Sequence, residues 1–536
     1  MKPKNVSIQA TPVRGSRRAA FLFASSLVCL SMRAAMAAEL YHDGDLDVRW
    51  DNTLRYTAAV RLLPRDGELV SNPNWDDGDR NFSPGLISNR LDLLSEFDVT
   101  DGNFGLRLSA SGWYDDVYHH HTDNDSPATF NPVSVPHDEF TKDVRMLHGT
   151  DAQLDDAFVH GSFDLGTIPA SFRLGRYVLL WGESLFFGNN AIAAGQAPTD
   201  VIRELGQPGA YAKENFLPVW QGSISLQPWE DVSLSGYYQF QWRKNRLPGS
   251  GSYFSYADYQ DTGGERILPV PGNPFYGALL RADDLRGPDS GQYGVALMVT
   301  GTEFNYGLYA LRFNAKEPQL YMYPGRLLRQ DGVYRLVYPS GIELYGASFS
   351  TYLGDSNLAG EASVRRNMPL VSLPQIVFPG TAADGSRHPL YAIGDTLHAQ
   401  VSTGRTFTNS SLWQRADANL EVAANDRFSV SKNSPALDRG RDHFAAALQA
   451  SFTPQYFEVL PALDVSIPLT LGYGFVGNSS TDETQNAGAG SFTIGLAATY
   501  RAVWQAQLNF THFIGSPAEQ RLADRDFLVF SVQRTF

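Results

Sequence analysis

Residues 46–61 read LDVRWDNTLRYTAAVR, and apolar and polar side chains alternate along this segment. In an extended chain one face would be apolar, interrupted only by Asn52, and would consist of Leu46, Val48, Trp50, Leu54, Tyr56, Ala58 and Val60. The opposite face would carry acidic, basic and threonine side chains. A period of two is typical of a β-strand whose two faces meet different surroundings. The segment therefore predicts a strand.

The same alternation recurs along the chain, for example over residues 90–99, 104–111 and 232–242. Counting such segments predicts about sixteen strands, within a range of about 14 to 18, whereas a soluble β-sandwich needs only seven to nine. After residue 37 the sequence contains no run of eighteen apolar residues that could form a transmembrane helix. A chain that crosses a membrane without helices must close into a barrel. We therefore predict an all-β fold, with residues 38–536 forming a single antiparallel transmembrane β-barrel.

The first 37 residues have the features of a secretory signal peptide. Basic residues precede an apolar stretch over residues 19–32, and small residues at 35 and 37 offer a cleavage site. The chain has 536 residues and a net charge of −14, and removal of the six basic residues of this segment would lower the charge to −20. An acidic chain argues against general binding to nucleic acid. The single cysteine, Cys29, would leave with the signal, which excludes disulfides and cysteine-based zinc sites.

The C-terminal segment, FLVFSVQRTF over residues 527–536, also alternates. It resembles the C-terminal signal that the outer-membrane barrel assembly machinery reads, although Arg534 departs from that pattern. The residues predicted to form this signal share one face: Leu528, Phe530, Val532 and Phe536. We therefore expect the protein in the outer membrane of a Gram-negative bacterium, surrounded by lipid and lipopolysaccharide and inserted by the assembly machinery.

Charged residues occupy the polar face of the first three strands. An arginine facing lipid would cost about 2–4 kcal/mol at the membrane midplane, so we expect these side chains to face the lumen. There they could form a charged pore wall, a dock for an inner plug, or merely cross-strand ion pairs. The residues of this predicted wall are Arg49, Asp51, Arg55, Arg61, Arg90, Asp92, Glu96, Asp98 and Arg107.

Segment 177–220 is too apolar for a free loop. Residues 199–205 predict a short helix that is capped by Thr199 or Asp200 and ended by Gly206. We expect the segment to fold into the barrel as a gate, the alternative being a structured extracellular loop. The predicted gate residues are Trp181, Glu183, Phe186, Phe187, Arg203 and Glu204, with the last two pairing with Asp92, Glu96 or Arg55.

Chemical motifs are otherwise sparse. The histidines at 119–121 lie near several aspartates, but consecutive side chains of an extended chain point in opposite directions, which favours a solvated loop over a metal site. The sequence contains none of the common nucleophile, metalloprotease or nucleotide-binding motifs. We therefore predict no catalytic residue, no metal and no cofactor.

Four segments carry a family resemblance: VRWDNTLRY at 48–56, SNRLDLLSEFDV at 88–99, SGWYDD at 111–116 and LWGESLFFG at 180–188. They resemble a proteobacterial family called domain of unknown function 1302, over essentially the whole chain after the signal. The resemblance implies an outer-membrane barrel, often encoded near a lipoprotein-sorting-like partner family and an RND-type transporter. It also implies a link to hydrophobic compounds such as steroids, terpenes or alkanes, and it carries no catalytic residue.

We therefore expect a passive channel for hydrophobic or amphipathic small molecules, for uptake or export. Only residues 38–45 would precede the first strand, too few for an N-terminal plug, so we expect any gate to come from an internal insertion. The alternatives are a porin for polar solutes, a surface or scaffold barrel, and a barrel hydrolase with a dispersed site.

Overall fold

The computed structural model describes residues 38–206, 215–270, 277–325, 330–408 and 410–536. The predicted signal peptide, residues 1–37, lies outside the described residues, as do residues 207–214 of the predicted gate segment. In the described parts of the chain, no helix is both long and apolar enough to cross a membrane.

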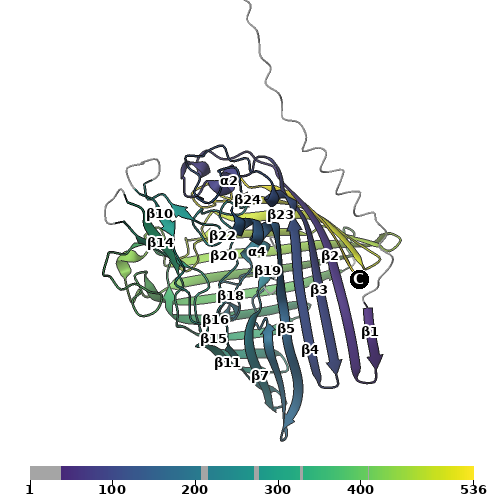
Figure 1. Ribbon diagram of the computed structural model, residues 1–536. Coiled ribbons are helices and arrows are strands. Elements are labelled where there is room, and N and C mark those ends of the chain that lie inside the picture. The colour runs from purple at the N-terminus through teal and green to yellow at the C-terminus, as the bar shows by residue number, and fades with distance from the viewer. Residues whose placement is uncertain (1–37, 207–214, 271–276, 326–329, 409) are drawn as a thin grey trace, which may run out of the picture.

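The described residues form a closed antiparallel barrel of 18 strands (Figure 1). Pairing of the last strand with the first, from Thr53 opposite Thr535 to Arg61 opposite Phe527, closes the barrel. The prediction of a transmembrane barrel is thus confirmed, and 18 strands is the upper end of the predicted range. In chain order the strands are β2 (Leu46–Arg61), β3 (Gly85–Asp101), β4 (Phe104–Asp115), β5 (Thr150–Leu165), β6 (Ile168–Tyr177), β7 (Val219–Trp229), β8 (Val232–Gln239), β11 (Gln292–Thr300), β12 (Phe304–Phe313), β15 (Ile342–Leu353), β16 (Ser356–Pro369), β18 (Ile393–Thr408), β19 (Arg415–Arg427), β20 (Phe444–Leu460), β22 (Leu469–Val476), β23 (Gly490–Tyr500), β24 (Trp504–Ile514) and β25 (Phe527–Thr535).

Two further strands belong to the same sheet without adding a position to the wall. Strand β1 (Ala38–Asp43) pairs with β2 over residues 46–50, beyond the end of the pairing between β25 and β2. Strand β21 (Leu463–Ser466) precedes β22 between the same two neighbours, β20 and β23. The short break between β21 and β22 contains Pro468, which cannot donate a hydrogen bond to a neighbouring strand.

The two ends of the barrel differ. At one end the strands are joined by short turns such as residues 102–103, 166–167 and 354–355, and at the other by long segments such as residues 62–84, 116–149 and 240–291. In outer-membrane barrels the short turns lie on the periplasmic side and the long loops on the outside. The end with the short turns is thus the periplasmic end, and the end with the long loops is the outer end.

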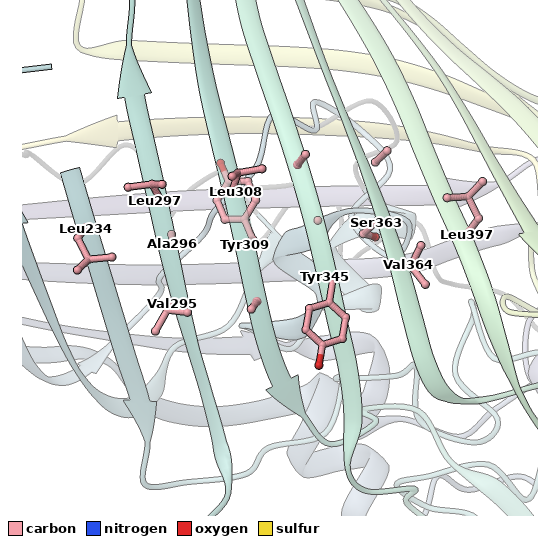
Figure 2. A pocket seen from close by; sticks show the side chains of 14 residues that line it. Leu234, Val295, Ala296, Leu297, Leu308, Tyr309, Tyr345, Ser363, Val364 and Leu397 are labelled. Carbon is pink, nitrogen blue, oxygen red and sulfur yellow. The ribbon is translucent and has the colours of Figure 1, made fainter. Parts of the chain in front are cut away.

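The two faces of the wall have opposite chemistry. Large apolar side chains that are exposed on the outer surface include Leu234, Val295, Leu308, Tyr345 and Leu397, and Figure 2 shows them around a shallow hollow of about 570 Å³. Alternate residues of the same strands point inward and are buried and often polar. An exposed apolar outer face over a polar interior is the reverse of a soluble protein and is the arrangement expected in lipid.

The outer loops pack together over one side of the barrel opening (Figure 1). They form a second sheet of five short strands, in the order β17 (Gln375–Ile376), β13 (Gln319–Tyr323), β14 (Gly332–Val337), β10 (Leu279–Arg281) and β9 (Arg266–Ile267). Trp242, Tyr334 and Tyr338 are buried in the core of this sheet. Short helical turns complete the loops, namely η1 (Leu69–Ser71), α2 (Asp77–Arg80), η2 (Asp116–His119), α3 (Lys142–Val144), η3 (Arg145–Gly149), η4 (Ile192–Gly195), α4 (Val201–Gly206) and η5 (Ser434–Ala436).

Candidate functional site

The segment between β6 and β7 folds into the barrel, and we call it the lumen loop (residues 178–206 and 215–218 are described). One contact of this loop with the wall is at Glu421 on β19. The Glu421 carboxylate accepts hydrogen bonds from the backbone N–H groups of Leu185 at 3.0 Å, Phe186 at 2.6 Å and Phe187 at 3.1 Å. Glu421 is completely buried. Because the acceptor is charged and the donors have no water, these bonds are stronger than ordinary backbone bonds.

A second contact comes from Glu361 and Arg365, two inward-facing residues of β16. Glu361 accepts from the backbone N–H of Glu183 at 2.6 Å and of Ile192 at 2.8 Å. Arg365 donates to three consecutive backbone carbonyls, those of residues 189–191, at 2.8–3.0 Å. One acidic and one basic side chain thus satisfy both kinds of backbone group in a loop that has little secondary structure of its own.

Apolar packing holds the other side of the lumen loop. The Trp181 ring lies against Tyr237 of β8 and Tyr309 of β12, with ring centroids 5.1 and 6.0 Å apart. Ile192 is fully buried in the same cluster. Lys316 adds a polar contact, because its Nζ donates to the Ala194 carbonyl at 2.7 Å. The loop is therefore bound to the wall on several sides of the lumen.

The short helix expected over residues 199–205 corresponds to α4. Asp200 precedes it, and its Oδ1 accepts from the backbone N–H of Arg203 at 3.2 Å, which is the contact of an N-cap. The other Asp200 oxygen binds Arg246 at 2.8 Å. The cap therefore also joins the helix to the segment that follows β8.

The predicted partners of Arg203 and Glu204 require correction. Glu204 lies near the carboxylates of Asp200 and Asp482, and it forms no ion pair with Arg55 among the described residues. Arg203 lies near Arg55, a like charge. The prediction failed because it assumed that β2 and β3 hold the loop, whereas Glu361, Arg365 and Glu421 on the opposite side of the barrel do so.

The charged residues of the first strands mostly pair with one another. The Arg107 guanidinium contacts Asp98 at 3.0 Å, Asp156 at 3.5 Å and also Glu96. This network crosses β3, β4 and β5, so cross-strand ion pairing accounts for its charges.

The remaining wall residues have other surroundings. Arg90 pairs with Asp92 at 2.7 Å, Arg49 with Asp47 at 3.0 Å, and Arg55 donates to the Gln533 side chain at 2.8 Å, while Asp51 lies opposite Glu96 in the strand register. A role of these residues as a pore wall stays a prediction.

Arg61 is the exception and corrects its assignment to the pore wall. Its side chain is fully buried, and its guanidinium binds Asp79 at 3.0 Å and Asp524 at 2.8 Å. It also donates to the carbonyls of Leu63 at 2.9 Å and Phe82 at 3.0 Å. As the last residue of β2, Arg61 lies where the chain leaves the wall, and it fastens loops 62–84 and 515–526 to the rim.

A cavity of about 600 Å³ lies between the lumen loop and the outer loops, and we call it the outer vestibule. The lumen loop contributes apolar side chains to it: Phe186, Phe187, Val201, Leu205 and Phe216. Among the described residues two arginines, Arg441 and Arg521, also line the vestibule, together with six carboxylates: Glu204, Glu317, Asp438, Asp482, Glu483 and Glu519. The vestibule is therefore apolar on one side and negatively charged overall.

Three of the six predicted gate residues do not line this vestibule, namely Trp181, Glu183 and Arg203. Trp181 instead borders a second cavity of about 460 Å³, which extends toward the periplasmic turn at residues 102–103 and is lined by Ser223, Ser225 and Ser235. Glu183 contributes its backbone N–H to Glu361. Of the six predicted gate residues, Phe186, Phe187 and Glu204 border the outer vestibule.

The sequence reasoning missed Glu361, Arg365 and Glu421. The signal was present, because residues 359–365 read AGEASVR and place Glu361 and Arg365 on one face of a strand that is otherwise made of small or apolar residues. The cost of a charge in lipid, applied to β16 and β19 as it was to β2 and β3, would have placed these side chains inside the barrel. Their backbone partners could not have been deduced.

The C-terminal strand completes the wall. Leu528, Phe530 and Val532 lie opposite Val60, Ala58 and Tyr56 of β2, on the outer face. The backbone of Phe536 exchanges two hydrogen bonds with Asn52, at 2.8 and 2.9 Å. The Arg534 guanidinium lies 5.2 Å from the Trp504 ring centroid, a cation–π contact that accommodates the charge on this face.

The histidines at 119–121 do not share a partner. They contact Thr150 at 2.7 Å, Asp116 at 3.2 Å and Asp138 at 3.1 Å, respectively. Each ring thus has a different partner.

Comparison with known proteins gives distant structural relatives and one family. OccAB3 of Acinetobacter baumannii is 10% identical, with a TM-score of 0.43, over 91% of this chain and 99% of that chain. OccK2 (OpdF) of Pseudomonas aeruginosa, solved in complex with glucuronate, is 11% identical, with a TM-score of 0.42, over 92% and 99%. No curated protein matches the chain. The model of a family described as "Protein of unknown function (DUF1302)" matches residues 18–536, so the chain belongs to the family that its sequence motifs resemble.

Proposed function

We propose that the protein is a passive outer-membrane channel for small amphipathic molecules that have an apolar body and a neutral or positively charged polar end. The observation that carries this proposal is the outer vestibule, which is lined by Phe186 and Phe187 of the lumen loop together with six carboxylates. The apolar body of an amphipathic solute would gain binding free energy from the aromatic side of this cavity, and its polar end would gain from the carboxylates. The contacts that hold the lumen loop inside the barrel support a role for this loop as the narrowing element of the path.

Two physical effects support this solute class. Removal of apolar area from water contributes about 25 cal/mol per Å², so about 40 Å² of contact with the partly exposed Phe187 ring contributes about 1 kcal/mol. The excess of carboxylates over arginines in the vestibule gives a negative local potential, which concentrates cations and repels anions. Both effects are weak enough for a solute to leave again, as passage requires.

The proposal is tested with protein reconstituted into lipid bilayers and liposomes. Under a potassium chloride gradient, the reversal potential should show preference for potassium over chloride. A cationic amphipathic dye should enter liposomes faster than an anionic dye of similar size. Equal entry of both dyes, or preference for chloride, would contradict the proposal.

A separate variant tests whether the aromatic side chains of the vestibule contribute to passage of the dye. Phe186→Ala combined with Phe187→Ala should slow entry of the amphipathic dye about fivefold, because about 1 kcal/mol of contact is lost, mostly with the more exposed Phe187 ring. Potassium conductance should not change to match. The control is Phe240→Ala combined with Phe304→Ala, which removes two exposed rings from the outer surface. The control should behave as the unmodified protein.

A porin for polar solutes is the second candidate, and the polar half of the vestibule favours it. That function predicts equal entry of neutral sugars with or without Phe186 and Phe187.

The lipoprotein-sorting-like partner and the RND-type transporter stay predictions from the family resemblance, and crosslinking in cells followed by purification of the barrel would test them. A scaffold or hydrolase role predicts a barrel that conducts no solute.

A further inference from the structure

Three carboxylates are buried together in the outer loops. Asp76 and Asp77 lie at the start of α2 in loop 62–84, and Asp258 lies in loop 240–291. Each offers an oxygen, and these oxygens lie within 4.8 Å of one another. All three residues are at most 1% exposed.

The three carboxylates of this cluster form one ion pair among the described residues. Arg80 pairs with Asp76 at 2.5 Å. Asp77 and Asp258 form no ion pair with any residue that the structure describes. Carboxylates this close cannot all be charged without a further positive group.

Several buried oxygens at the same place have no donor. Asp258 Oδ1 and Asp76 Oδ1 accept no hydrogen bond within the described part of the chain. The same holds for Oδ1 of Asn131, a fully buried residue whose backbone N–H donates to Asp77 at 3.0 Å. An unsatisfied buried polar group costs about 1–3 kcal/mol, so the folded loops would gain from a ligand that binds oxygen.

We propose that Asp76, Asp77 and Asp258 bind one calcium ion that ties loop 62–84 to loop 240–291. Calcium binds oxygens at 2.3–2.6 Å, so two of its ligands can be up to about 5 Å apart, and the observed spacing fits this limit. The donors are all oxygen atoms, which favours a hard cation over zinc or copper. The ion supplies the positive charge that the cluster lacks, and backbone carbonyls or water complete its coordination.

Terbium luminescence tests the site directly in the full-length protein in detergent. Terbium binds calcium sites, and Trp75, next to Asp76 in the sequence, can sensitise its emission. The unmodified protein should show saturable emission that calcium displaces. Asp258→Asn should lose at least 90% of this emission. Asp125→Asn, a control that removes an exposed carboxylate of the adjoining outer loop, should retain it.

A second measurement separates binding from misfolding. Barrel assembly is checked by heat-modifiable migration on a gel, and cleavage of the outer loops by a protease is then compared in calcium and in chelator. Calcium should slow cleavage in loops 62–84 and 240–291 about tenfold in the unmodified protein and should have no effect in Asp77→Asn. Absence of calcium-displaceable emission from the assembled unmodified protein, or full emission from assembled Asp258→Asn, would overturn the proposal. Equal cleavage of the unmodified protein in calcium and chelator would also overturn it.

Discussion

Replacement of Glu421 by glutamine should loosen the lumen loop without disturbing the barrel. The glutamate accepts three backbone N–H groups of residues 185–187 while completely buried. Glutamine keeps the shape of the side chain, but one of its two terminal atoms becomes a donor that faces other donors. At least one N–H group of the lumen loop then loses its hydrogen-bond acceptor. The remaining hydrogen bonds are weaker, because their acceptor is a neutral amide oxygen and no longer a charged carboxylate.

The expected size of the effect follows from these contacts. Hydrogen bonds to a charged group contribute about 1.5–3 kcal/mol each. Loss of one such bond and weakening of the other two should destabilise the docked state of residues 185–187 by about 3 kcal/mol. Since about 1.4 kcal/mol corresponds to a tenfold change in an equilibrium constant, the undocked fraction should rise on the order of 100-fold. Glu361 and Arg365 still hold residues 183 and 189–192, so the change stays local.

Single-channel recording in planar bilayers measures this change. The variant should show openings to a larger conductance on the order of 100 times more often than the unmodified protein, in proportion to the undocked fraction. The matched control is Glu96→Gln, which removes a carboxylate from the opposite wall that contacts Arg107 and not the lumen loop. The control should show the openings of the unmodified protein.

One outcome would refute a role of the Glu421 contacts in restricting the channel. If Glu421→Gln and Glu96→Gln both assemble, as judged by heat-modifiable migration, and show the same conductance and opening frequency, the contacts of Glu421 do not restrict the channel. The lumen loop would then not be its gate.

Two further predictions concern assembly and the rim. Deletion of Phe536 should lower the heat-modifiable, membrane-inserted fraction several-fold, because it removes both the predicted assembly signal and two hydrogen bonds that β25 exchanges with Asn52; normal insertion of this variant would contradict the prediction. Arg61→Ala leaves the buried carboxylates of Asp79 and Asp524 with fewer cationic partners. The variant should therefore destabilise the packing of the outer loops by about 3–5 kcal/mol. Faster proteolysis of loops 62–84 and 515–526 would measure this change. Arg49→Ala, which removes an exposed guanidinium from the same strand, should leave the proteolysis rate unchanged.

The architecture of this protein could be predicted from local sequence. Alternation in residues 46–61 and its repetition along the chain indicate strands, and the cost of charge in lipid indicates which face is outside. These rules act on neighbouring residues of one strand, so one sequence is enough to apply them. They also predicted that segment 177–220 is too apolar for a free loop and contains a short helix, where the structure has α4.

The contacts that hold the candidate site depend on the closed barrel. Glu421 follows Phe186 by 235 residues, and no local rule connects the two; they meet because β19 stands across the lumen from the strands that carry the loop. The same is true of Arg61 and Asp524, which are 463 residues apart, and of the cluster that joins Asp77 to Asp258. The sequence by itself determined the barrel, its lipid-facing surface and the loop that is too apolar for water. Only the tertiary structure decided the partners of each charged side chain, because closure of the barrel and packing of the loops determine which distant residues share a buried site.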